Sequence, residues 1–156
     1  MTWKAMSSER ACDVVDFWLA APWPQTPAQV QQLGERIGWT PDDDEMMENG
    51  ADELSEPAVP IVSMPTGETA SLNFWATDVV RTLGPEGDAF LDDRYALLVR
   101  EGVRRWGEAA LSNSDGPTAQ WDDASGARVV VSRGKRSVTV DFTTPQYARV
   151  LRELGE

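Results

Sequence analysis

Histidine is absent from this chain of 156 residues, and cysteine occurs only once, as Cys12. Without histidine the chain cannot form a Ser-His-Asp triad, use a histidine general base or bind a metal through imidazole. With one cysteine it cannot form an internal disulfide or a zinc site built from thiolates. These absences favour a protein without catalytic residues, metal or cofactor.

Long hydrophobic runs are also missing. No segment approaches the roughly 18 consecutive apolar residues of a membrane-spanning helix. The first ten residues, MTWKAMSSER, lack the apolar core of a signal peptide. A lone thiol is typical of a reducing compartment. We therefore expect a cytoplasmic protein that does not contact a membrane.

Basic residues are scarce: 14 Lys and Arg stand against 26 Asp and Glu, which gives a net charge of −12. Because nucleic-acid binding depends on cationic contacts with phosphates, we expect no nucleic-acid partner. The same charge favours a basic protein partner. The length predicts one domain, residues 1–156, in which residues 1–6 form a flexible arm.

Apolar spacing and capping residues predict five helices. Ser7 and Ser8 precede an amphipathic stretch that includes Trp18. Thr26-Pro27-Ala28-Gln29 reads as a capping box with proline at the first helical position. Thr-Pro pairs at positions 40–41 and 144–145 predict two more helix starts by the same argument. The predicted helices are 9–21, 27–37, 41–48, 88–106 and a C-terminal helix that begins at 145.

Strand patterns occur in two groups that do not alternate with helices. The predicted strands are 61–64, 71–76, 119–121, 128–132 and 137–142. Apolar and polar residues alternate from Val138 to Phe142, which is typical of an antiparallel strand with one buried face. The short turn at Gly134 predicts a hairpin that pairs Val129–Ser132 with Val138–Val140. The fold class is therefore α+β: an antiparallel sheet with N-terminal, central and C-terminal helices packed mainly on one face.

Residues 42–56, the acidic segment, carry eight acidic side chains and no basic one. Removing these eight leaves 18 acidic against 14 basic residues, so two thirds of the excess negative charge lies here. The eight are Asp42, Asp43, Asp44, Glu45, Glu48, Asp52, Glu53 and Glu56.

Two interpretations of the acidic segment remain open. A helix that begins at Pro41 places Asp42–Asp44 in its first turn, where the helix dipole stabilises each carboxylate by about 0.3–1 kcal/mol. The other carboxylates lie beyond that turn and repel one another. The segment is then either a solvated face or a docking surface for a basic partner. It does not match a calcium-binding EF-hand, because Met46 and Met47 stand where a ligand and a glycine are required.

Tryptophan is frequent, with seven residues. Trp18 falls on the apolar face of the first predicted helix, so we expect it to be buried. Trp23 lies between two prolines in a loop and is the tryptophan that we expect to be most exposed. Because tryptophan is enriched at binding hot spots, we include Trp23 in the docking surface. Folding of the Trp23 ring back onto the core is the alternative.

Several short phrases along the chain carry a resemblance. They are Val15-Asp16-Phe17-Trp18-Leu19, Ile37-Gly38-Trp39-Thr40-Pro41-Asp42-Asp43-Asp44, Leu54-Ser55-Glu56-Pro57, Leu72-Asn73-Phe74-Trp75, Val99-Arg100-Glu101-Gly102 with Trp106-Gly107, and the strands around Trp121. With them the chain resembles, over roughly its full length, an uncharacterised family of small acidic actinobacterial proteins. Such proteins look like the immunity partners of polymorphic toxins. The resemblance implies an inhibitor of a toxin domain that acts on nucleic acid or a nucleotide, and it implies no catalytic residues.

We interpret the chain as a non-catalytic immunity protein that neutralises a basic toxin domain, the product of an adjacent gene, by blocking its active or substrate site. The acidic segment and Trp23 would form the docking surface of a monomer or weak dimer, with carboxylates in place of the substrate's phosphates. The alternative is an acidic homodimeric secretion chaperone for an exported protein. A third interpretation is a carboxylate- or metal-dependent enzyme.

Overall fold

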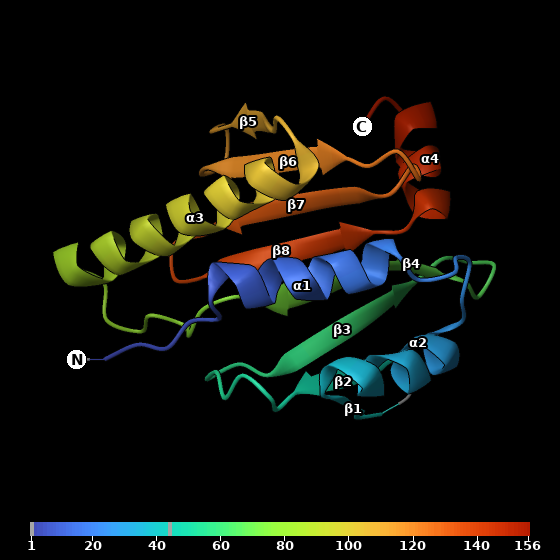
Figure 1. Ribbon diagram of the computed structural model, residues 1–156, viewed down its shortest axis with the longest axis horizontal. Coiled ribbons are helices and arrows are strands. Elements are labelled where there is room, and N and C mark those ends of the chain that lie inside the picture. The colour runs from blue at the N-terminus through green and yellow to red at the C-terminus, as the bar shows by residue number, and fades with distance from the viewer. Residues whose placement is uncertain (1, 44) are drawn as a thin grey trace.

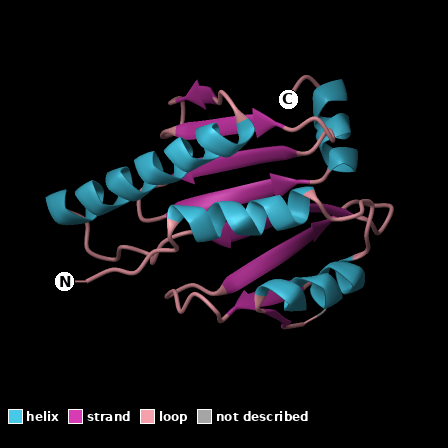
Figure 2. Cartoon of the chain, viewed as in Figure 1, coloured by secondary structure: helices cyan, strands magenta, loops and turns pink. Residues whose placement is uncertain are grey.

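A computed structural model describes residues 2–43 and 45–156 (Figure 1). It confirms the α+β class, with helices and strands as drawn in Figure 2. The helices are α1 (Ser8–Leu19), α2 (Pro27–Gly34), the 3-10 turn η1 (Glu35–Ile37), α3 (Pro85–Trp106) and α4 (Pro145–Glu153). The strands are β1 (Trp39–Pro41), β2 (Met46–Asn49), β3 (Ala58–Ser63), β4 (Thr69–Trp75), β5 (Ala110–Ser112), β6 (Thr118–Asp122), β7 (Arg128–Arg133) and β8 (Val138–Thr143).

All of these strands join one antiparallel sheet in the order β1-β2-β3-β4-β8-β7-β6-β5. The two groups of strands meet where β4 pairs with β8, and Leu72 there lies opposite Phe142. The hairpin predicted across Gly134 is confirmed, since Val131 of β7 lies opposite Val140 of β8. The edge strand β5 is an addition that the sequence pattern did not predict.

Helices α1, α2 and α3 lie on the same face of the sheet (Figure 1). The Ser7 side chain caps α1 by accepting a hydrogen bond from the Arg10 backbone nitrogen. The capping box predicted for α2 is present, with both of its hydrogen bonds formed between Thr26 and Gln29. Of the helices in the described part of the chain, none is both long and apolar enough to cross a membrane.

Aromatic rings form the centre of the core on this covered face. Trp18 of α1 is fully buried, as predicted, and its ring centroid lies 5.8 Å from that of Trp39 on β1. The Trp39 ring in turn packs edge-on against Phe74 of β4, at 5.5 Å. These contacts tie α1 and the β1 edge to the middle of the sheet.

The helix predicted at 41–48 is wrong, because this stretch forms the hairpin of β1 and β2. Trp39 lies opposite Asn49 and Pro41 opposite Met47. Trp39 and Met47 are fully buried, so their packing outweighs the local helix signal. Pro41 suits this edge strand, because the backbone N–H that proline lacks is not needed there for a hydrogen bond to a neighbouring strand. Asp42 and Asp43 therefore gain no stabilisation from a helix dipole, and Asp44 lies outside the described residues.

Part of the segment expected to form a flexible arm, residues 3–6, contacts the rest of the chain. The Met6 backbone nitrogen donates to the Ala76 carbonyl at 2.8 Å, and the Asp78 nitrogen donates to the Lys4 carbonyl at 2.8 Å. The Trp3 ring packs against Phe90 of α3, with centroids 5.4 Å apart. Residues 3–6 are thus part of the packed domain, and Met1 lies outside the described residues.

Gly102 allows α3 to approach the sheet closely, which makes the effect of Gly102→Ala predictable. A Cβ at Gly102 would lie 2.8 Å from the Trp121 ring and 3.1 Å from Trp106. At an open helix position, glycine-to-alanine replacement stabilises by about 0.5–1 kcal/mol. Here we expect overpacking to lower the free energy of unfolding by about 1–3 kcal/mol, measured by urea denaturation.

The exposed α3 residue Ala89 provides the control for this prediction. Ala89→Gly should lower the free energy of unfolding by about 1 kcal/mol through helix propensity alone. A Gly102→Ala protein that is more stable than the parent would show that the close approach of α3 does not constrain this position.

Candidate functional site

The acidic segment lies at the β1 edge of the sheet. It includes the turn between β1 and β2, strand β2 and the loop that leads to β3. Its side chains fall into two groups: those that meet a partner from elsewhere in the chain and those that do not.

Asp52 is the best-paired member of the acidic segment. Arg10 of α1 donates from Nε to both carboxylate oxygens of Asp52, at 3.3 and 3.2 Å. A terminal nitrogen of Arg10 also donates to the Ile37 carbonyl at 2.8 Å. The Asp52 side chain is only 15% exposed. This carboxylate therefore joins α1 to the loop after β2, which is a structural role.

Two further acidic residues face cations. Glu56 pairs with Arg81 at 3.3 Å, and Glu53 pairs with Lys4 at 3.6 Å. A fourth, Glu45, accepts a hydrogen bond from the Ser63 hydroxyl at 3.1 Å. Although the segment itself carries no basic residue, Asp52, Glu53 and Glu56 therefore have cationic partners, which come from distant parts of the sequence.

Asp42, Asp43 and Glu48 form the second group: they are exposed and form no ion pair with the described residues. Gln31 of α2 holds the turn between them, because its side-chain amide donates to the Asp43 and Met46 carbonyls. Glu48 alternates with buried Met47 and so lies on the face of the sheet away from α1–α3. We call Asp42, Asp43 and Glu48 the free hairpin carboxylates.

Trp23 does not project from its loop. Its indole nitrogen donates to the Trp18 carbonyl at 2.8 Å, and its ring lies 5.5 Å from Phe142 of β8. The side chain is partly buried, like those of Trp3 and Trp75. The ring therefore folds back onto the core, which is the alternative that the sequence left open, and a role of Trp23 in docking stays a prediction.

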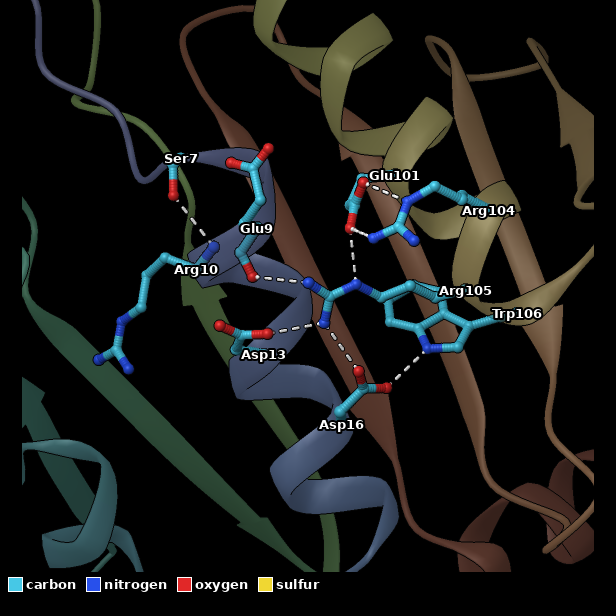
Figure 3. A network of polar contacts seen from close by, with 9 residues as sticks. All are labelled: Ser7, Glu9, Arg10, Asp13, Asp16, Glu101, Arg104, Arg105 and Trp106. Atoms are coloured by element: carbon cyan, nitrogen blue, oxygen red, sulfur yellow. Dashed lines mark hydrogen bonds and ion pairs between the residues drawn. The ribbon is translucent and has the colours of Figure 1, made fainter.

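A network of ion pairs joins α1 to α3 (Figure 3). Arg105 of α3 donates to Asp13 at 2.7 Å, to Asp16 at 2.8 Å and to Glu101 at 2.7 Å. The Trp106 indole nitrogen donates to the other oxygen of Asp16 at 2.8 Å. Hydrogen bonds from Arg104 and Arg105 lower the pKa of Glu101 to about 2. With these carboxylates held by arginine, the network acts as a clamp between the two helices.

Cys12 lies on the buried side of α1, beside this network. Burial is the main cause that raises the pKa of its thiol to about 12. The thiol therefore stays protonated at neutral pH and is not an activated nucleophile. Among residues 2–43 and 45–156, no three side chains of His, Cys, Asp or Glu gather as a metal site would require.

A family comparison covers most of the elements described above. A family model matches residues 9–144, from α1 to the residue that follows the last strand, β8. The chain belongs to DUF6301, a family of unknown function. Membership of an uncharacterised family is thus confirmed. No curated protein and no solved structure gives a significant match.

Asp141 is a candidate functional residue of this family member that the sequence analysis did not single out. It occupies the middle of β8, opposite Asn73 of β4 and Val130 of β7. Its carboxylate is partly buried, and burial raises its pKa to about 6. Among the described residues, none donates a hydrogen bond to it or pairs with it. The polar alternation along β8 and the rarity of aspartate inside strands were the available signals.

The raised pKa of Asp141 predicts how Asp141→Asn changes stability with pH. Because the folded-state pKa lies above the ordinary value, the folded state takes up a proton more readily than the unfolded state between about pH 4 and 6. Parent stability therefore falls as pH rises through 6. We expect Asp141→Asn to raise the free energy of unfolding by about 1–3 kcal/mol at pH 8 and to have little effect at pH 4.

Urea denaturation at pH 4, 6 and 8 measures this difference. Asp93→Asn, on the exposed surface of α3, is the control for the loss of one negative charge. Equal pH profiles for the two variants would contradict a special cost of ionised Asp141.

Proposed function

We propose that this protein is a non-catalytic immunity protein that neutralises a basic toxin domain by docking on it and blocking its active or substrate site. The observation that carries the proposal is the set of free hairpin carboxylates. Asp42, Asp43 and Glu48 stay exposed and form no ion pair within the described part of the chain, although Lys4, Arg10 and Arg81 pair with their neighbours. They concentrate negative charge at one end of the sheet.

Electrostatic attraction gives this arrangement a physical consequence. A chain with a net charge of −12 attracts a basic protein before contact, and a local cluster of carboxylates orients the encounter. Toxins that act on nucleic acid or a nucleotide bind phosphates through cationic side chains, so carboxylates can occupy the same positions. The proposed partner is the product of the adjacent gene.

Neutralising the free hairpin carboxylates tests this function. The variant Asp42→Asn, Asp43→Asn, Glu48→Gln should slow association with the product of the adjacent reading frame by about tenfold at low ionic strength. The difference should shrink near 1 M salt, where the Debye length is only about 3 Å. Stopped-flow or surface-plasmon measurements of association and dissociation rates at both salt concentrations give the result.

The matched control removes the same charge elsewhere. Asp93, Glu108 and Asp115 are exposed and belong to no ion pair of the described chain. Their change to Asn, Gln and Asn leaves the net charge equal to that of the hairpin variant, so only the position differs. Equal association rates for the two variants would sink the docking role of the hairpin.

A specific observation favours the alternative function, an acidic secretion chaperone. A groove of about 630 Å³ runs between α3 and strands β5 and β6, and Tyr95, Val99 and Leu111 line it. Leu111 is 72% exposed. It lies on β5, an edge strand whose outer side pairs with no other described strand. An extended polypeptide that pairs with β5 would place apolar side chains in this groove.

Leu111→Asp separates the chaperone from the immunity protein. If the protein is a chaperone, Leu111→Asp should weaken its binding to an unfolded, carboxymethylated polypeptide, because the substitution places a charge in the apolar groove. Fluorescence anisotropy of the labelled polypeptide measures this binding. Leu83→Asp, at another exposed leucine, is the control. If the parent does not bind the polypeptide at all, the chaperone function is rejected.

A further inference from the structure

Among the described helices, none lies across the face of the sheet opposite α1, α2 and α3 (Figure 1). Helix α4 meets this face only at one end, where Arg152 pairs with Asp122 at 3.3 Å. One row across this face is formed by Asn73, Asp141, Val130 and Gln120, on adjacent strands β4, β8, β7 and β6. These side chains are all partly buried, whereas their neighbours in sequence on β4 and β8, such as Phe74 and Val140, are at most 1% exposed. We call this surface the uncovered face.

Some charged side chains on the uncovered face have an ion-pair partner among the described residues, and others do not. Arg128 and Asp122, at one end, pair with each other at 2.9 Å. Asp141 lies in the centre of the face and Glu48 on the β2 side, and neither has a cationic partner among the described residues. A partly buried carboxylate without a hydrogen bond is costly for the folded chain, as its raised pKa indicates.

We propose that the uncovered face is the docking surface for the basic protein partner, and that a lysine or arginine side chain of the partner lies on Asp141. This inference rests on the proposed function and extends its contact surface from the β1–β2 hairpin to the centre of the sheet. Glu48 belongs to both surfaces, since it is a free hairpin carboxylate that lies on the uncovered face.

Charge complementarity favours this occupant over a second copy of the chain. A two-fold dimer through the uncovered face would bring two faces together whose unpaired charges are all carboxylates. Nucleic acid would meet the same repulsion through its phosphates. A cation from a basic protein instead neutralises Asp141 and removes the cost of its burial.

Apolar side chains around Asp141 supply the rest of a docking site. Trp75 lies opposite Thr139, one position along the face from Asp141, and its ring is partly exposed. Val130 lies directly opposite Asp141, and Val62 of β3 is 49% exposed. A central charge among aromatic and aliphatic side chains is typical of an interface hot spot, because the surrounding contacts exclude water from the ion pair.

Asp141→Asn tests the inference with the purified product of the adjacent reading frame as the probe. Loss of the ion pair should lower affinity by about 10- to 100-fold, mostly through faster dissociation. The same substitution should raise the stability of the free protein at pH 8. A residue with a merely structural role would not weaken binding while stabilising the fold. Rates from surface-plasmon resonance and urea denaturation of the free variant give both values.

A second variant supplies the cation from within the chain. Asn73→Lys places an ammonium group opposite Asp141 on β4, where it should pair with the carboxylate and displace the partner's side chain. Affinity should again fall by about tenfold or more, with the fold retained. Asp93→Asn, on the covered side of the molecule, should bind the probe like the parent.

The outcomes distinguish this inference from the proposed function. If the parent binds the probe and both Asp141→Asn and Asn73→Lys bind it equally well, the inference is overturned while the proposed function stands. If the parent does not bind the probe, the proposed function fails and the inference falls with it. Weaker binding by both variants, with unchanged binding by Asp93→Asn, supports the inference.

Discussion

The burial of Trp18 between α1 and the sheet is the contact on which the rest of the packing depends. Its ring is fully buried and lies within 6.1 Å of the rings of Trp23 and Trp39. Through these two neighbours it reaches Phe142 of β8 and Phe74 of β4. The cluster thus fixes the loop after α1 and the β1 edge at once. It explains why β1 and β2 form a hairpin and why the Trp23 ring folds back onto the core.

Polar contacts determine how the helices share the covered face. Arg105 holds Asp13 and Asp16 of α1 against Glu101 of α3, so the two helices pack side by side (Figure 3). Below them, Gly102 lets α3 lie directly on Trp121 of β6. With α1–α3 all on this side, the aromatic cluster around Trp18, Trp39 and Phe74 lies there. On the opposite face the central row from Asn73 to Gln120 is only partly buried, and in the proposed complex this is the surface that meets the partner.

Short sequence patterns correctly predicted the elements that are determined by interactions between residues close in sequence. The caps of α1 and α2 and the alternation along β8 depend on neighbours within a few residues, and each appears as predicted. The helix start at Thr40-Pro41 failed because the burial of Trp39 and Met47 depends on strands distant in sequence. The pairing of Asp52 with Arg10 spans 42 residues and has no local signature. Charge density along the sequence could therefore locate the acidic segment but not show which of its carboxylates remain free.

The contribution of a carboxylate to binding depends more on its burial than on the number of carboxylates beside it. The free hairpin carboxylates are solvated, so each ion pair that they form with a partner contributes little, about 0–1 kcal/mol, and acts mainly on the rate of encounter. Asp141 is different, because burial already disfavours its charge before any partner arrives. A cation placed on it removes an existing cost and adds an attraction that water screens only weakly. In the proposed complex, Asp141 on the uncovered face would therefore set the rate of dissociation, and the free hairpin carboxylates would set the rate of association.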